Sequence, residues 1–91
     1  MTAVSRTLRI INEKGLHARA SAKFVEVVEQ FDAQARVTKD AMTVSGDSIM
    51  GLLMLAASRG TSIHVETLGQ DAGPLADALA ALVSNRFGED H

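Results

Sequence analysis

The sequence predicts an α+β fold: an open-faced two-layer sandwich of order β-α-β-β-α-β-α, with a four-stranded antiparallel sheet and three helices on one face. Three observations lead to this prediction. Several segments alternate apolar and polar residues, as half-buried strands do. Others space their apolar residues by three and four, as helices with one buried stripe do, and only short loops separate the segments. Because 91 residues suffice for one domain, we expect residues 1–91 to form a single one.

The first third of the chain predicts a strand, a loop and a helix. Residues 5–11 alternate, with Leu8 and Ile10 on one face, and predict the first strand. Residues 12–17 form a loop, and residues 18–30 then predict a helix. The apolar stripe of this helix consists of Phe24, Val27, Val28 and Phe31.

Three further segments predict strands. Residues 33–39 and 42–45 form two short strands joined by a tight turn. Residues 61–68 alternate again, with Ile63 and Val65 on one face, and predict the fourth strand.

A short second helix is predicted over residues 49–58. Asp47 or Ser48 can cap the free N–H groups of its first turn, and Gly60 suits its C-terminal end.

The last helix is expected to begin at Asp71 and to end at Gly88. Asp71 is in position to cap it, and Pro74 lies near the first turn, where the missing N–H is harmless. The predicted helical row consists of Leu75, Ala78, Leu79, Leu82 and Arg86.

Composition excludes several classes of protein. The net charge is -2 and only 3% of residues are aromatic, so the chain lacks the basic excess and the stacking platform of a nucleic-acid binder. Without cysteine there is no disulfide framework and no thiolate nucleophile. The longest apolar stretch, residues 52–57, is far too short to span a bilayer, and the first residues do not resemble a signal peptide. We therefore expect a cytoplasmic protein that binds no membrane.

The clearest chemistry lies between Gly15 and Arg19. His17 stands where a loop becomes a helix, and the first N–H groups of a helix, together with its dipole, attract anions. An imidazole there can attack phosphorus, and the backbone N–H groups of Ala18 and Arg19 can receive the phosphoryl oxygens. The guanidinium of Arg19 adds a donor fork suited to phosphate. The pattern predicts a phosphoryl acceptor.

Two other interpretations of His17 stay open from spacing alone. A histidine at a helix start is often a cap or a solvated side chain. A His–Arg pair can also bind a carboxylate without covalent chemistry.

The short helix over residues 49–58 is apolar nearly all the way round. Ile49 and Leu53 share one face, so either this face or the opposite one is exposed as a partner site, or the helix is buried on two sides. The opposite face is formed by Leu52, Leu55 and Ala56. Ser48 is expected to be a cap, and its phosphorylation would bring about two negative charges beside the apolar patch.

The other histidines carry weaker signals. His64 lies on the polar face of a strand beside Glu66, and His91 is the last residue. We expect no metal site and no cofactor.

The segments GLHARASAKF, residues 15–24, and SIMGLLML, residues 48–55, resemble HPr, the histidine-containing phosphocarrier of the bacterial phosphoenolpyruvate phosphotransferase system. The resemblance covers about residues 5–87. It implies that phospho-Enzyme I phosphorylates His17 on Nδ1 and that an EIIA-type domain then accepts the phosphoryl group. It also implies that Arg19 stabilises this group. It also implies that Ser48 is the regulatory serine targeted by HPr kinase/phosphorylase. The partner-facing positions it implies are Ala22, Ile49, Met50 and Leu53.

Two positions depart from the family pattern. Ala20 stands where the family usually has proline, which points towards the nitrogen-related or regulatory branch of these carriers. Asp47 places an acid directly before Ser48, which makes the regulatory role of that serine less secure.

The sequence therefore predicts a monomeric, stoichiometric phosphoryl carrier rather than an enzyme. One alternative is a regulatory carrier whose phosphorylation state is sensed by partners. A second is a non-covalent anion-binding module, in which His17 and Arg19 hold an anionic ligand. A small acyl-phosphate hydrolase is the weakest candidate, because no water-activating group is evident in the motif.

Overall fold

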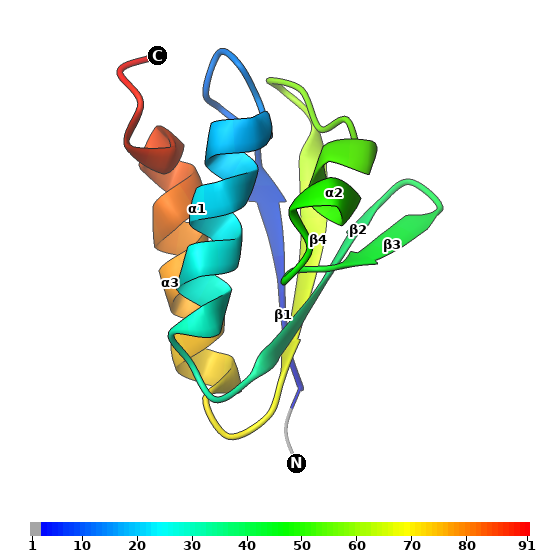
Figure 1. Cartoon of the computed structure of the whole chain (residues 1–91), viewed down its shortest axis with the longest axis vertical. Coiled ribbons are helices and arrows are strands. Elements are labelled where there is room, and N and C mark those ends of the chain that lie inside the picture. The colour runs from blue at the N-terminus through cyan, green and yellow to red at the C-terminus, as the bar shows by residue number, and fades with distance from the viewer. Residues whose placement is uncertain (1–2) are drawn as a thin grey trace.

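The computed structural model describes residues 3–91, which fold into a four-stranded sheet covered on one face by helices (Figure 1). This confirms the predicted open-faced α+β sandwich and its element order. In chain order the elements are β1 (Ala3–Arg9), α1 (Ala18–Glu29), β2 (Gln34–Lys39), β3 (Met42–Ser45), α2 (Ile49–Met54), β4 (Ser62–Leu68), α3 (Ala72–Ser84) and a 3₁₀ turn, η1 (Arg86–Gly88).

The sheet has the order β1-β4-β2-β3, and every neighbouring pair is antiparallel. Val65 at the centre of β4 pairs with Arg6 of β1 on one side and with Val37 of β2 on the other. Helices α1 and α3 lie side by side along the sheet, and α2 lies beside α1 near the β2–β3 hairpin (Figure 1). This arrangement leaves the other face of the sheet open.

The core lies between the helices and the sheet. Phe24 and Val28 of α1 pack in one buried cluster with Ile63 and Val65 of β4, because the apolar stripe of the helix faces the apolar side of the strand. These burials confirm the predicted centres of the first helix and the fourth strand.

The predicted first strand is shifted in the structure. β1 begins at Ala3 and ends at Arg9, so Ile10 and Ile11 lie outside it. Ile10 is nevertheless fully buried, and its carbonyl oxygen accepts a hydrogen bond of 2.7 Å from the N–H of Gly60.

The second helix is shorter than predicted. It ends at Met54, because Ala56 adopts a left-handed backbone with φ 51° that no helix can continue. Leu55 and Ala57, on either side of this residue, are both buried. Gly60 therefore belongs to the turn before β4 and does not terminate α2.

The predicted row of the last helix was partly wrong. α3 ends at Ser84, and Arg86 beyond it is exposed in a left-handed conformation with φ 54°. Ala78 and Leu82 are only half-buried, because the helix is rotated relative to the predicted row. Its buried residues are Ala72, Leu75, Ala76, Leu79 and Val83.

Of the predicted helix caps, one is confirmed. The hydroxyl of Ser48 accepts a hydrogen bond of 3.0 Å from the N–H of Gly51, as an N-cap does. Asp71 occupies the N-cap position of α3 but makes no capping bond with its side chain. Its carboxylate instead accepts a hydrogen bond of 2.8 Å from the N–H of Asp32, which ties the α1–β2 loop to α3.

Within residues 3–91, no helix is both long and apolar enough to cross a membrane.

Candidate functional site

His17 stands at the junction of the loop after β1 and helix α1. Directly before it, Gly15 has φ 65°, and a Cβ on this residue would lie 2.5 Å from the carbonyl oxygen of Ala57. Only glycine fits this close approach. The N–H of Leu16 then donates to that same carbonyl at 2.9 Å, so the segment after α2 holds the loop that presents His17.

The start of α1 has the geometry that the motif predicted. His17 has an extended backbone and occupies the N-cap position of α1, but its side chain makes no capping hydrogen bond. The first intrahelical bond runs from the N–H of Ser21 to the carbonyl of His17 at 2.8 Å. The N–H groups of Ala18 and Arg19 precede that bond, on an exposed stretch of chain. The interpretation of His17 as an ordinary side-chain cap is therefore wrong.

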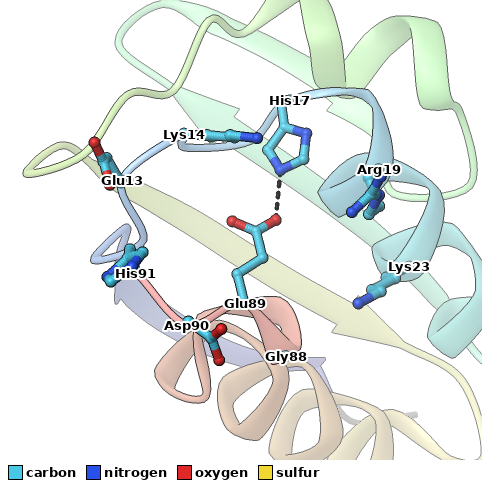
Figure 2. Close-up of a pocket in the computed structure, with 9 residues that line it drawn as sticks. All are labelled: Glu13, Lys14, His17, Arg19, Lys23, Gly88, Glu89, Asp90 and His91. Atoms are coloured by element: carbon cyan, nitrogen blue, oxygen red, sulfur yellow. Dashed lines mark hydrogen bonds and ion pairs between the residues drawn. The ribbon is translucent and has the colours of Figure 1, made fainter.

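A residue from the C-terminal end completes the site. The Nε2 of His17 lies 2.5 Å from Oε2 of Glu89, a residue 72 positions away in the chain (Figure 2). The side chains of His17 and Glu89 are 27% and 16% exposed, so this contact is largely shielded from water. Sequence reasoning missed Glu89, because no periodic pattern places a residue after the last helix.

Asn12 holds the second oxygen of the same carboxylate. Its side-chain amide donates to Oε1 of Glu89 at 3.0 Å and to the carbonyl of Gly15 at 2.8 Å. Asn12 is fully buried, and its own side-chain oxygen has no hydrogen-bond partner. The buried amide of Asn12 thus links the loop that precedes His17 to the carboxylate of Glu89.

The ionisation of Glu89 follows from these contacts. Burial by itself raises the pKa of Glu89, but the hydrogen bonds from His17 and Asn12, together with electrostatic interactions with His17 and Lys14, outweigh burial and lower it. Glu89 is therefore a carboxylate at neutral pH.

Burial and hydrogen bonds hold the C-terminal segment that carries Glu89 in place. Three consecutive residues of η1 have left-handed backbones, and Phe87 in their middle is fully buried. The ammonium group of Lys23 donates to the carbonyl of Phe87 at 2.7 Å. The N–H of Glu13 donates to the carbonyl of His91 at 2.9 Å, so the segment is fastened on both sides of Glu89.

An open cavity of about 360 Å³ lies beside His17. Lys14, Arg19 and Lys23 contribute positive charge to its lining (Figure 2). The guanidinium of Arg19 makes no hydrogen bond or ion pair with the part of the chain that the structure describes, so it is available to an anion. No group of three or more metal-ligating side chains occurs among residues 3–91.

The apolar helix α2 is buried on one side and exposed on the other. Leu52 is fully buried, whereas Ile49 and Met50 are 40% and 70% exposed. Leu53 is half-buried, as is Ala22 on α1. Two further methionines are exposed that the sequence did not single out, Met54 at the end of α2 at 64% and Met42 at the start of β3 at 42%. Ser48, at the start of the helix, is half-buried.

Of the remaining histidines, His64 lies on the sheet, and His91 is one of the residues that line the cavity beside His17 (Figure 2). His64 is exposed on β4, and its Nδ1 lies 3.4 Å from the hydroxyl of Thr7. The side chain of His91 is exposed, and it is the backbone carbonyl of this residue that fastens the C-terminal segment.

A histidine presented at a helix start on an open-faced sandwich is the arrangement of a phosphocarrier protein. A model of the family described as "PTS HPr component phosphorylation site" matches residues 4–85, and the chain belongs to this family, the HPr/NPr phosphocarriers of the phosphotransferase system.

Relatives and solved structures agree with this assignment. The phosphocarrier protein HPr of Neisseria meningitidis is 48% identical over 86 residues, which cover 94% of this chain and 97% of that protein. The phosphocarrier protein NPr of Shewanella violacea is 39% identical over 89 residues, covering 98% of each. A crystal structure of HPr from Thermoanaerobacter tengcongensis superimposes with a TM-score of 0.90 at 37% identity, with both chains fully covered.

Membership of the family has two direct consequences. The protein is a phosphocarrier and not a catalytic enzyme. Its partners are proteins of the phosphotransferase system, such as Enzyme I and EIIA-type proteins.

Proposed function

We propose that His17 is the residue that carries the phosphoryl group, accepted on Nδ1 from phospho-Enzyme I and passed to an EIIA-type protein. The observation that supports this most directly is the contact between Nε2 of His17 and Glu89. Because one ring nitrogen is engaged and the ring remains partly exposed, Nδ1 is the nitrogen left for chemistry.

The transfer needs only groups of this chain and of its partner. The lone pair of Nδ1 forms the new N–P bond, the N–P bond of the donor histidine breaks, and its electron pair returns to the donor nitrogen. The N–H groups of Ala18 and Arg19 and the guanidinium of Arg19 would receive the phosphoryl oxygens. This chain needs no metal or cofactor for that role.

The exposed side of α2 is the surface on which both partners would dock. In-line transfer between two imidazoles requires close approach of two proteins, and a shallow apolar patch suits a transient interface. Ile49, Met50 and Leu53, with Ala22 at the edge, form this docking patch, and the protein would act as a monomer in the cytoplasm. The whole chain, residues 1–91, would act as one domain of this kind.

Regulation at Ser48 is a separate part of the proposal. Phosphorylation by a kinase of the HPr kinase/phosphorylase type would place about two negative charges beside the docking patch and weaken partner binding. Asp47 directly precedes Ser48, and its negative charge would either lower phosphorylation there or suit a particular kinase. Incubation with ATP and that kinase tests the site, and failure of the unaltered protein to be labelled would remove Ser48 from the proposal.

A purely regulatory carrier remains the second candidate. Ala20 in place of the usual proline and the NPr relative favour it. In that role the phosphorylation state of His17 would be sensed by partners with little contribution to sugar uptake. The two roles differ in which EIIA-type protein accepts the phosphoryl group fastest.

The carrier function is tested by incubation with phosphoenolpyruvate and Enzyme I. We expect one phosphoryl adduct, stable to base and labile to acid. His17→Ala should abolish it, whereas His64→Ala, which removes an exposed histidine on the sheet, should leave it unchanged. An adduct that survives His17→Ala would exclude His17 as the acceptor, and no adduct on the unaltered protein would favour the non-covalent anion-binding module.

A further inference from the structure

The contact between Glu89 and His17 determines where the ring proton of the histidine resides. Glu89 is ionised at neutral pH, because its hydrogen bonds hold its pKa below the ordinary value. A carboxylate has no proton to give and can only accept. The contact of 2.5 Å therefore requires Nε2 of His17 to be the donor.

A donor at Nε2 has a consequence for the other nitrogen. A neutral imidazole carries one proton, so a ring protonated at Nε2 has its lone pair on Nδ1. An ionised carboxylate fixes a histidine tautomer in this way in Ser-His-Asp triads. Nδ1 is then the ring nitrogen whose lone pair is available to form the N–P bond.

We infer that Glu89 is the positioning residue of the carrier: it keeps the proton on Nε2 and leaves Nδ1 as the nucleophile. This inference rests on the proposed function of His17. It adds the residue that selects one of the two ring nitrogens, and it assigns a role to the C-terminal segment beyond the reach of the HPr-like motifs.

The same carboxylate serves the phosphorylated state. When the Nδ1–P bond forms and Nε2 keeps its proton, the ring acquires a positive charge. Glu89 balances this charge across the Nε2 contact. When the phosphoryl group leaves, the N–P electron pair returns to Nδ1 and the ring becomes neutral again, with its proton still on Nε2. Neither direction requires a proton from solvent.

The surroundings of Glu89 hold it in one orientation. Asn12 donates to its second oxygen, and the amide of Asn12 is fixed in turn by the carbonyl of Gly15. A glutamine at position 89 would have one oxygen to offer to two donors, Nε2 and the amide of Asn12. One of these hydrogen bonds would be lost, and the negative charge with it.

The test combines a spectroscopic and a kinetic measurement on the full chain. Nitrogen-15 NMR of the ring at neutral pH reports which nitrogen carries the proton. We expect the Nε2–H form to dominate in the unaltered protein. In Glu89→Gln the population of the Nδ1–H form should rise, and phosphorylation by Enzyme I should slow about tenfold, the effect of losing one hydrogen bond to a charged group. Unchanged amide spectra elsewhere would show that the fold is intact.

Two variants serve as matched controls for Glu89→Gln. Glu26→Gln makes the same chemical change on the exposed face of α1 and should alter neither measurement. Asp90→Asn removes a neighbouring negative charge that makes no hydrogen bond to the ring and should leave the tautomer in place. An equal rise of the Nδ1–H form in Asp90→Asn, or a Glu89→Gln variant with unaltered tautomer and rate, would overturn the inference.

The spectroscopic result is independent of the carrier function. If the unaltered protein shows the Nε2–H form but takes no phosphoryl group from Enzyme I, the proposed function fails while the tautomer assignment stands. If it is phosphorylated on His17 and Glu89→Gln behaves identically, the function stands and the positioning role fails.

Discussion

The ammonium group of Lys23 lies 2.7 Å from the carbonyl oxygen of Phe87. Lys23 belongs to the second turn of α1, and Phe87 is the buried anchor of the segment that carries Glu89. The helix that presents His17 therefore also holds the chain that supplies its partner carboxylate. His17 and Glu89, 72 residues apart in the chain, are thus both positioned by α1.

Loss of this support should weaken both the fold and the site. Lys23→Met keeps most of the side-chain stem but removes the donor, and we expect the free energy of unfolding to fall by about 1 kcal/mol. Urea denaturation measures the change. Arg36→Met, which removes an exposed group 3.9 Å from Glu66, should cost less, because exposed ion pairs contribute little. Equal losses in the two variants would contradict the anchoring role of Lys23.

Gly15→Ala should be among the most harmful small substitutions near the site. The residue has φ 65°, and the added Cβ would lie 2.5 Å from the carbonyl of Ala57, so backbone must move. We expect a loss of about 2 kcal/mol or more in the free energy of unfolding. Phosphorylation of His17 should slow as well, since the loop that presents it is displaced.

Gly73→Ala is the matched control for that substitution. Gly73 lies in the first turn of α3, and a Cβ there meets nothing within 4 Å. Because alanine is the better helix former, we expect this variant to be up to about 1 kcal/mol more stable than the unaltered protein. A destabilised Gly73→Ala would show that the response to Gly15→Ala is not specific to its geometry.

Features that depend on neighbouring residues were predicted from the sequence, whereas features that depend on contacts between distant residues were not. Ser48 as a cap and Phe24 at the centre of a buried stripe depend on neighbours within one or two turns, and both were found as predicted. The end of α2 depends on burying Leu55 and Ala57 against other elements, which helical spacing cannot reveal. That interaction explains why the helix was predicted four residues too long.

The candidate site shows the same division. His17, Ala18 and Arg19 are consecutive, and their position at a helix start follows from the change of periodicity after the loop. Glu89 reaches His17 only because three left-handed residues turn the chain back after α3. A glycine at 88 indicates a turn but not its direction, so the sequence contains no local signal for this contact.

The neighbouring acids Glu29 and Asp47 predict a pH dependence. A hydrogen bond from one carboxyl to the other needs a shared proton, and this bond with Asp47, followed by the charge of Asp47, raises the pKa of Glu29 above 4.5. A raised carboxyl pKa means that the folded state binds the proton more tightly than the unfolded state. This contribution to stability is present below the ordinary pKa and is lost as pH rises through the folded pKa.

Asp47→Asn should therefore bring the pKa of Glu29 back towards 4.5. Carboxyl chemical shifts followed by NMR during an acid titration measure this change. Asp32→Asn, three residues beyond Glu29 but not among the groups that shift its pKa, should leave the titration of Glu29 unaltered. If Glu29 titrates at the same pH with and without Asp47, the pairing of these acids is wrong.

A charge on the docking patch should slow partner reactions without affecting the fold. Met50 is 70% exposed and packs against no part of the buried cluster, so Met50→Glu should leave the free energy of unfolding within about 0.5 kcal/mol. Docking of an apolar partner surface would have to desolvate the new carboxylate, and we expect phosphorylation by Enzyme I to slow about tenfold or more. Because the chemistry at His17 is untouched, the effect should appear in KM rather than in the rate at saturating carrier. Met50→Leu keeps an apolar side chain of similar volume and should transfer at nearly the original rate. A Met50→Glu variant that is phosphorylated as fast as the unaltered protein would show that Enzyme I docks elsewhere.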